Sequence, residues 1–457
     1  MVVGCEAMNI LHVALGLPPL RTGGLTRYCT ELMEAQVQSG DRVSLVFPGR
    51  FLPDGVHFCK SAWRGITTYE LINPLPVALT YGVAEPGSFI AQCRNANIFD
   101  RLLKDVSPDV IHVHSFMGIY REFFQTVKDR SIPMVFTTHD YYPICPRCTL
   151  IDSGGNECRC FNSALDCATC CTGGMTLRKS VVMQSNLYAS LKSSALLKIL
   201  SSLVKSRMAS GGSASGEIII NEDKIILYSS LLDYNKSIFN LFDLILTNSV
   251  IAEQMYRNAF PEAVYRHTSI SHAGLSFEGL SARVKRSYEN LVIGYFGGQK
   301  EYKGFGTILE ASRELHNRGI DFELRLYGDE YTNLNIPEAI SCGRVLPEDM
   351  SRVLRGLDLV VVPSTYRETF GFVVLEALCA GVQVICSDAV GACELIDDDL
   401  IFPAGDIEAL TNLISIASKE GIASQAIPAS YPLSMDEQAR QLNDCYEMAK
   451  VILSGQK

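Results

Sequence analysis

Two glutamates eight residues apart, Glu368 and Glu376, lie where a strand is expected to give way to a helix. The apolar run at 357–362 predicts a buried strand, and the pattern at 372–380 predicts a helix. Glu368 therefore falls in the connecting loop, and Glu376 lies a little over one turn inside the helix. The free backbone N–H groups and the positive end of the helix dipole lie between them, which makes this stretch a candidate anion site.

Two carboxylates at this spacing cannot both face one anion, so the arrangement favours a ligand with two separate polar ends. A nucleotide sugar is such a ligand. Its sugar hydroxyls would bind Glu368, its ribose hydroxyls would bind Glu376, and its diphosphate would bind the backbone amides of Phe370, Gly371 and Phe372. The simpler alternative is an exposed loop glutamate followed by a first-turn glutamate that only complements the helix dipole.

The string ETFGFVVLEALCAGVQVI, which begins at Glu368, resembles the E-x7-E signature of the retaining glycosyltransferases of the large GT4 family. That resemblance implies the α/β GT-B fold, in which two Rossmann-like doubly wound domains face each other across a cleft. It also implies transfer of a sugar from a nucleotide-sugar donor, with retention at the anomeric carbon and without a metal ion at the active site. The carboxylate that contacts the transferred sugar would then be Glu368.

Further positions extend the resemblance into the rest of the second half of the chain. Lys303 and Gly304 resemble the K-G pair of the family, whose lysine reaches the donor diphosphate. One departure is that Gly298 occupies the place where many relatives have a phosphate-binding arginine. We expect Lys300 or Arg344 to replace it, and the backbone around Arg344 lies where the family holds the base.

The first half of the chain offers a glycine pair and two strand-end histidines. Gly23 and Gly24 precede a predicted helix, allow close approach of backbone to phosphate, and resemble the GG-x-x-R loop of the family. His114 ends one predicted strand and His139 follows the next, where doubly wound sheets collect ligands. The family places histidines in both positions, facing the acceptor or the transferred sugar. His114 is favoured over His112 because it lies nearer the strand end, and the alternative for each is a satisfied structural histidine.

A cysteine-rich stretch follows directly after this strand. It contains a C-x2-C pair at each end and a glycine-rich centre, which is a spacing typical of metal ligands. Zinc on four thiolates is the leading interpretation, an iron–sulfur cluster is the second, and reduced thiols in a loop is the third. The seven candidate ligands are Cys145, Cys148, Cys158, Cys160, Cys167, Cys170 and Cys171.

Residues 172–216 contain six lysines or arginines and no acidic residue, in a chain whose net charge is −10. Wound as a helix, residues 187–207 place most of their apolar side chains on one side, which is the pattern of an interfacial membrane anchor. Packing of the same helix on its own domain is the equal alternative. The glycine- and serine-rich stretch at 210–216 predicts a flexible linker.

The length of 457 residues is too great for one core and predicts two domains. Strands are expected at 9–15, 43–47, 109–114, 134–138 and 242–248 in the first domain, and at 291–296, 322–327, 357–362 and 382–386 in the second. The first domain is predicted at 8–280, with insertions at 145–171 and 172–216. A hinge is expected at 281–288, the donor domain at 289–430 and a helix that crosses back to the first domain at 431–457.

Composition narrows the class of protein. The acidic net charge argues against a nucleic-acid binder. The N-terminus lacks the pattern of a signal peptide, and no run reaches the length of a membrane span. Sixteen cysteines without a secretory signal favour a reducing cytoplasm.

The sequence therefore predicts a cytoplasmic retaining glycosyltransferase, associated peripherally with the membrane, that uses a UDP- or GDP-sugar. Its expected acceptor is a lipid-linked saccharide in the biosynthesis of a capsule, O-antigen or exopolysaccharide. One alternative is a binding or scaffold protein with the GT-B fold that uses the cysteine-rich loop for interaction. A sugar-nucleotide epimerase of the same fold is another.

Overall fold

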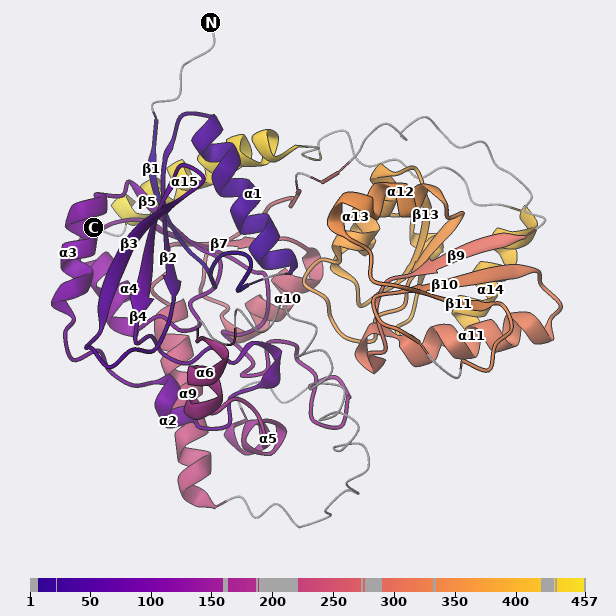
Figure 1. Ribbon diagram of the computed structural model, residues 1–457, viewed down its shortest axis with the longest axis horizontal. Helices are drawn as coiled ribbons and strands as arrows, with labels where there is room; N and C mark the ends of the chain where they lie inside the picture. Colours follow the sequence, from indigo (N-terminus) through magenta and orange to yellow (C-terminus); the bar gives the residue numbers. More distant parts are fainter. Residues whose placement is uncertain are drawn as a thin grey trace, which may run out of the picture.

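The structure is a computed structural model of the whole chain. It describes residues 7–21, 23–158, 163–185, 188, 221–272, 274–275, 290–331, 334–420, 431 and 434–455. These residues form two α/β lobes that lie side by side, the first in indigo to pink and the second in orange (Figure 1). The basic segment at 187–207, the linker at 210–216 and the hinge at 281–288 lie largely or wholly outside the described residues.

The first lobe is built on an eight-stranded sheet in the order β3-β4-β2-β1-β5-β6-β7-β8. Neighbouring strands are parallel except β3 and β4, which form an antiparallel hairpin at one edge. The central strands β5 and β6 are buried along their whole length, as expected for a sheet covered on both faces. The strands are β1 Asn9–Val13, β2 Arg42–Pro48, β3 His57–Trp63, β4 Ile66–Ile72, β5 Val110–Val113, β6 Met134–Thr137, β7 Leu244–Thr247 and β8 Tyr265–His267.

Helices cover both faces of this sheet. Several begin at a residue whose side chain accepts a hydrogen bond from a first-turn N–H, as Ser249 does for α10. The α-helices of this lobe are α1 Gly24–Gln38, α2 Pro86–Phe89, α3 Asn97–Val106, α4 Arg121–Asp129, α5 Ala164–Cys170, α6 Leu177–Met183, α9 Glu222–Phe239 and α10 Val250–Ala259.

The second lobe is built on a six-stranded parallel sheet in the order β11-β10-β9-β12-β13-β14. Its strands are β9 Leu291–Tyr295, β10 Phe322–Tyr327, β11 Ala339–Gly343, β12 Leu359–Val362, β13 Gln383–Ser387 and β14 Ile401–Phe402. Its α-helices are α11 Phe305–Asn317, α12 Met350–Arg355, α13 Phe372–Cys379 and α14 Ile407–Glu420. Single-turn 3₁₀ helices at Glu301–Lys303 and Gly391–Leu395 flank the sheet's carboxyl edge.

The last helix, α15 (Met435–Gly455), returns to the first lobe (Figure 1). It packs on α1 and against β6 and β7, and its Tyr446 is completely buried. One hydrophobic cluster continues from the first sheet through α15 and α13 into the second lobe, so the two lobes share a packed seam. In the described part of the chain, no helix is both long and apolar enough to cross a membrane.

The structure contains edge strands that were not expected, including β11 and β14 at the two edges of the second sheet. The stretch at 242–248 was expected to be the last strand of its sheet, but β8 follows it at the sheet edge. The β3–β4 hairpin was not expected either. Its strands are partly exposed and lie at the edge of the sheet, where the apolar pattern of a buried strand is weak.

Candidate active site

A cavity of about 350 Å³ lies between the two lobes, at the carboxyl ends of the central strands of both sheets. The first lobe contributes Gly24 at the start of α1, His139 after β6 and Asn248 after β7. The second lobe contributes the residues after β9 and β12 and the start of α13. Doubly wound sheets bind ligands at this edge. Among the predicted site residues, the cavity lining includes Gly24, His139, Lys303, Glu368, Phe370, Gly371 and Phe372.

Lys303 and Glu368 meet at the floor of this cavity. The ammonium nitrogen of Lys303 lies 2.7 Å from Oε1 of Glu368, whose carboxylate also accepts a hydrogen bond from the hydroxyl of Ser364. Burial lowers the pKa of Lys303, but the charges of Glu368 and Tyr366 outweigh that effect and raise it overall. The lysine is therefore a permanent cation at neutral pH, aimed into the space where a ligand would bind.

The glycine of the K-G pair explains how Lys303 reaches this position. Gly304 has φ = 77°, and a Cβ at this residue would lie 1.8 Å from the carbonyl oxygen of Pro363. Only glycine permits so close an approach between the loop after β9 and the end of β12. The backbone N–H of Thr365 donates to the carbonyl of Tyr302 across the same contact, at 2.9 Å.

Helix α13 points its N-terminus at the cavity. Gly371, just before the helix, has φ = 102°, and a Cβ here would lie 2.8 Å from Val390, so this turn also requires glycine. The first-turn N–H groups near Phe370 and Phe372 carry the positive end of the helix dipole. The cavity thus combines a lysine and a helix N-terminus, both suited to an anion.

Glu376 lies in a neighbouring cavity of about 510 Å³ that is lined by both lobes. Its Oε1 lies 3.1 Å from Nε2 of His272 and 3.7 Å from a guanidinium nitrogen of Arg27. Gly23 lines this cavity and Gly24 lines both, so the glycine pair lies at the junction between them. Arg27 and His272 also line this cavity, and neither was among the site residues expected from the sequence. For Arg27 the available signal was the GG-x-x-R spacing, in which it is the arginine.

The structure does not bring the expected substitutes for the missing arginine into the cavity. A Cβ at Gly298 would lie 2.6 Å from a carboxylate oxygen of Asp329, so this turn leaves little room for a larger side chain. Lys300 is exposed and lies over the ring of Tyr302, and the exposed Arg344 donates to the carbonyl of Gly328. Neither lines the cavity, where Lys303 is the cationic side chain among the described residues.

The histidines divide into one at the surface of the cavity and others behind it. His139 lines the cavity, and its carbonyl accepts a hydrogen bond from the hydroxyl of Thr369 in the second lobe, at 2.9 Å. His114 is buried and does not line the cavity; its Nδ1 lies 3.1 Å from Nε2 of His139. Burial lowers the pKa of His139 to about 3. Of the two predicted histidines, His139 therefore lines the cavity, and His114 lies behind it in contact with His139.

The cysteine-rich segment packs beside the cavity. Cys145, Cys158, Cys167 and Cys170 lie close enough to influence one another's charge. Burial raises the pKa of Cys145 to about 11, against hydrogen bonds from the backbone and with a smaller contribution from the neighbouring thiols. A hydrogen bond with Cys171 lowers the pKa of Cys170 to about 7.

Two observations limit the predicted metal site. The thiol of Cys148 donates to the carbonyl of Leu79 at 3.3 Å, which turns it toward the backbone, and Cys160 lies outside the described residues. In the described part of the chain, groups of three ligand atoms within 4.8 Å of one another involve histidines and Cys29, not this segment. Metal binding here remains a prediction. An ion pair between Glu157 and Arg367 joins the segment to the loop that carries Glu368.

Comparison with known proteins matches a family model to each lobe. Residues 22–157 match the model described as Glycosyltransferase Family 4, and residues 290–418 match the model described as Glycosyl transferases group 1. A D-inositol 3-phosphate glycosyltransferase of Corynebacterium kroppenstedtii is 30% identical over 190 residues, which cover 35% of this chain and 40% of that protein. An uncharacterized 42.6 kDa protein in the cps region of Klebsiella pneumoniae is 21% identical, over 66% of this chain and 62% of that protein. The chain thus spans less than two thirds of the length of these relatives.

Solved structures agree on the fold. Anabaena Alr3699/HepE in complex with UDP and glucose superposes with a TM-score of 0.53 at 14% identity, covering 96% of this chain and 99% of that one. Structural neighbours of this kind are GT-B glycosyltransferases, with two parallel-sheet α/β domains as found here. With a glycosyltransferase model matched on each lobe and this fold, the chain belongs to the GT4 glycosyltransferases, the glycosyl transferases group 1.

Proposed function

We propose that the protein is a retaining glycosyltransferase that moves a hexose from a nucleotide-sugar donor to a saccharide acceptor. The observation that carries the proposal is the convergence of Lys303, Glu368 and the N-terminus of α13 in one cavity, opposite His139 of the other lobe. This arrangement provides positive charge for a diphosphate and a carboxylate for sugar hydroxyls within one site. The first lobe, 8–280, would bind the acceptor, and the second, 289–430, the donor.

The donor would lie along α13. Its diphosphate would contact Lys303 and the first-turn N–H groups, its sugar would contact Glu368, and its ribose would contact Glu376 in the adjoining cavity. To bind the ribose, the carboxylate of Glu376 would either give up its contact with His272 or contact His272 and the ribose hydroxyls together. The complex of Anabaena Alr3699/HepE with UDP and glucose supports a UDP-sugar as the first donor to test.

Retention follows when the acceptor attacks from the face that the diphosphate leaves. The bond between the anomeric carbon and the phosphate oxygen breaks, and the acceptor oxygen bonds to that carbon. The acceptor proton passes to the departing phosphate oxygen. Lys303 and the α13 amides stabilise the charge that develops on the diphosphate, so these protein groups suffice as its counter-charge without a metal ion.

The acceptor we propose is a lipid-linked saccharide of a surface polysaccharide, met at the cytoplasmic face of the membrane. Two features support it: the basic segment at 187–207 and the relative from the cps region of Klebsiella pneumoniae. Anionic lipid headgroups attract such a segment by about 1 kcal/mol for each basic residue.

Stereochemistry tests the proposed reaction. The protein is incubated with α-linked UDP- and GDP-hexoses and saccharide acceptors, and the anomeric proton of the product is followed by NMR. We expect an α-linked product. A β-linked product would overturn retention, and donor binding without transfer to any acceptor would favour the scaffold alternative.

A further inference from the structure

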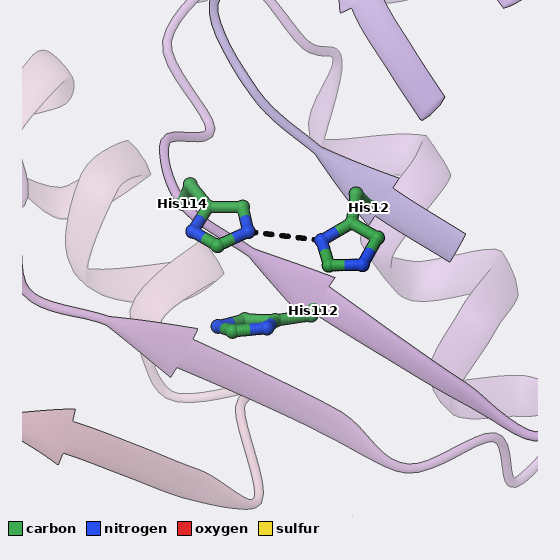
Figure 2. A group of neighbouring side chains, drawn as sticks. All are labelled: His12, His112 and His114. Carbon is green, nitrogen blue, oxygen red and sulfur yellow. Dashed lines mark hydrogen bonds between the residues drawn. The ribbon is translucent and has the colours of Figure 1, made fainter. Parts of the chain in front are cut away.

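Three buried histidines lie together behind the cavity, on neighbouring strands of the first sheet (Figure 2). His12 lies on β1, His112 lies on β5, and His114 directly follows β5. None is more than 1% exposed, and the rings of His12 and His114 are stacked within 5° of parallel. Sequence reasoning treated His12 only as part of a buried strand, so the cluster became visible when β1 and β5 paired.

The ring nitrogens of the cluster already have partners. Nδ1 of His12 lies 2.9 Å from Nε2 of His114, and Nδ1 of His114 lies 3.1 Å from Nε2 of His139. Nε2 of His12 lies 2.8 Å from Oε1 of Gln36. These contacts form one continuous row that runs from Gln36 through two buried rings to the cavity.

His112 belongs to a side branch of the same network. Its Nδ1 lies 2.8 Å from the hydroxyl of Tyr446, and its Nε2 lies 2.7 Å from the hydroxyl of Thr137. Nitrogens of His12, His112 and His114 do lie within 4.8 Å of one another, as in a metal site. A metal ion would have to break these hydrogen bonds, and three neutral rings would leave its charge uncompensated in a buried place. The geometry therefore favours a hydrogen-bonded network.

The histidines of the row are neutral at physiological pH. Burial lowers the pKa of His12 to about 4, against a weaker opposing effect of Gln36, and burial lowers that of His139 to about 3. Burial and the neighbouring rings hold the pKa of His114 well below its usual value. A neutral imidazole has one N–H and one lone pair. In a row of such rings, the tautomer of each one fixes the tautomer of the next.

The amide of Gln36 sets the direction of the row. Its oxygen faces His12, so Nε2 of His12 carries the proton and Nδ1 carries a lone pair. His114 must then donate from Nε2 to His12, and His139 must donate from Nε2 to His114. Nδ1 of His139 is left with a lone pair and has no hydrogen-bond partner among the described residues. Turning the amide over would reverse every tautomer and place a proton on that nitrogen.

We propose that Gln36, His12 and His114 are positioning residues that hold His139 in the tautomer protonated on Nε2, so that Nδ1 accepts a hydrogen bond from a hydroxyl group in the cavity. A ring with the opposite tautomer would donate there, and a sugar or acceptor hydroxyl would have to turn its proton away. The inference rests on the proposed function only for the identity of that hydroxyl. The tautomer itself can be observed without turnover.

The orientation of Gln36 depends in turn on the last helix. Nε2 of Gln36 donates to the hydroxyl of Tyr446 at 3.0 Å, and the same hydroxyl lies 2.8 Å from Nδ1 of His112. Tyr446 lies on α15, the helix that crosses back to the first lobe. The crossing helix therefore acts on the active site through hydrogen bonds, although Tyr446 does not line the cavity.

Nitrogen-15 NMR of histidine-labelled protein tests the proposal, because the chemical shifts of the two ring nitrogens identify each tautomer. The chain has eight histidines, so the spectrum is small enough to assign by substitution. We expect His12, His114 and His139 to be protonated on Nε2 at pH 7. Gln36→Glu should preserve this pattern because a carboxylate can only accept from His12, whereas Gln36→Leu should give a mixture of tautomers at His139.

Activity and control variants separate positioning from simple stability. Tyr446→Phe removes the acceptor for the Gln36 amide and should also mix the tautomers of His139. Tyr431→Phe is the matched control, because this buried hydroxyl donates to the carbonyl of Ile270 outside the network. We expect kcat to fall about fivefold in Gln36→Leu with an unchanged KM for the donor, and to be retained in Gln36→Glu, since one hydrogen bond is worth about 1 kcal/mol.

Three results would overturn the proposal. They are a proton on Nδ1 of His139 in the wild type, an unchanged His139 tautomer in both Gln36→Leu and Tyr446→Phe, and stoichiometric displacement of the three histidine signals by added zinc. If Gln36→Leu does not fold, Tyr446→Phe and Gln36→Glu still decide the question. Failure of the glycosyl transfer assay would leave the tautomer pattern intact, so the two ideas fail separately.

Discussion

Acid should destabilise the first lobe through its buried histidines. In the unfolded chain His12 takes up a proton near pH 6.5, but in the folded protein burial lowers its pKa to about 4. Between these values the unfolded state binds more protons, so the free energy of unfolding falls as the pH falls. The stability is fully present above about pH 6.5 and is lost progressively toward pH 4.

The size of the effect follows from the lowered pKa values of His12 and His139. At about 1.36 kcal/mol for each pH unit, His12 alone accounts for about 3 kcal/mol by pH 4. His139, whose pKa is lowered to about 3, contributes a similar amount over the same range. Together they remove about 6 kcal/mol, comparable with the whole stability of an ordinary domain. His112 and His114 shift in the same direction and add to it.

Urea unfolding at a series of pH values measures this loss. Trp63 is the single tryptophan and lies on β3, so its fluorescence reports on the first lobe. Between pH 6 and pH 4.5, the free energy of unfolding of His12→Asn should fall less steeply than that of the wild type, by about 1.4 kcal/mol per pH unit, because one titrating group is gone. Equal slopes for His12→Asn and wild type would refute the reasoning.

Three further predictions concern the ligand, the cysteines and the membrane. Glu376→Ala should weaken donor binding and Glu368→Ala should chiefly lower kcat, each by about ten- to a hundredfold, because each removes a charge-assisted hydrogen bond. Binding calorimetry and steady-state kinetics measure the two effects, and full activity in both variants would reject the assignment. Protein purified anaerobically without chelator should carry structural metal on the Cys145–Cys171 segment, most readily zinc, by elemental analysis; substoichiometric zinc and iron would exclude it. Wild-type protein should float with anionic liposomes at low salt and less so at high salt, and Lys198→Glu/Lys205→Glu should float less; a wild type that stays in the soluble fraction at low salt would favour a soluble acceptor.

The residues that line the cavity from the second lobe could be expected from the sequence, although their roles stay predictions. Glu368, Lys303 and the glycines beside them form a local pattern, in which strand, turn and helix follow within a few residues. Such a pattern can be recognised in a sequence because the turn requires glycine at fixed positions, as at Gly304 and Gly371, where φ is positive and a Cβ would clash with a neighbouring residue. The buried strands around them also followed from their apolar runs, while edge strands such as the β3–β4 hairpin did not, because an edge strand is only half buried.

Contacts between distant segments could not be predicted in the same way. His12 and His114 are 102 residues apart, and Tyr446 lies 334 residues from His112. Nothing in the local sequence of β1 distinguishes a buried histidine in a network from any other buried residue. The same reason applies to the expected substitutes for the missing arginine, because the sequence does not show that the side chain of Lys300 lies over Tyr302 and that of Arg344 against Gly328.

Hydrolysis of nucleotide sugars by wild type, Lys303→Ala and Lys300→Ala tests the central claim most directly. The two lysines are three residues apart, but Lys303 lines the cavity beside Glu368, and Lys300 is exposed outside it. If the donor diphosphate binds in this cavity, the wild type releases nucleoside diphosphate from at least one UDP- or GDP-sugar, Lys300→Ala keeps most of that activity, and Lys303→Ala loses about a hundredfold or more. Equal activity of Lys303→Ala and wild type, or no release from any donor by the folded wild-type protein, would contradict the account.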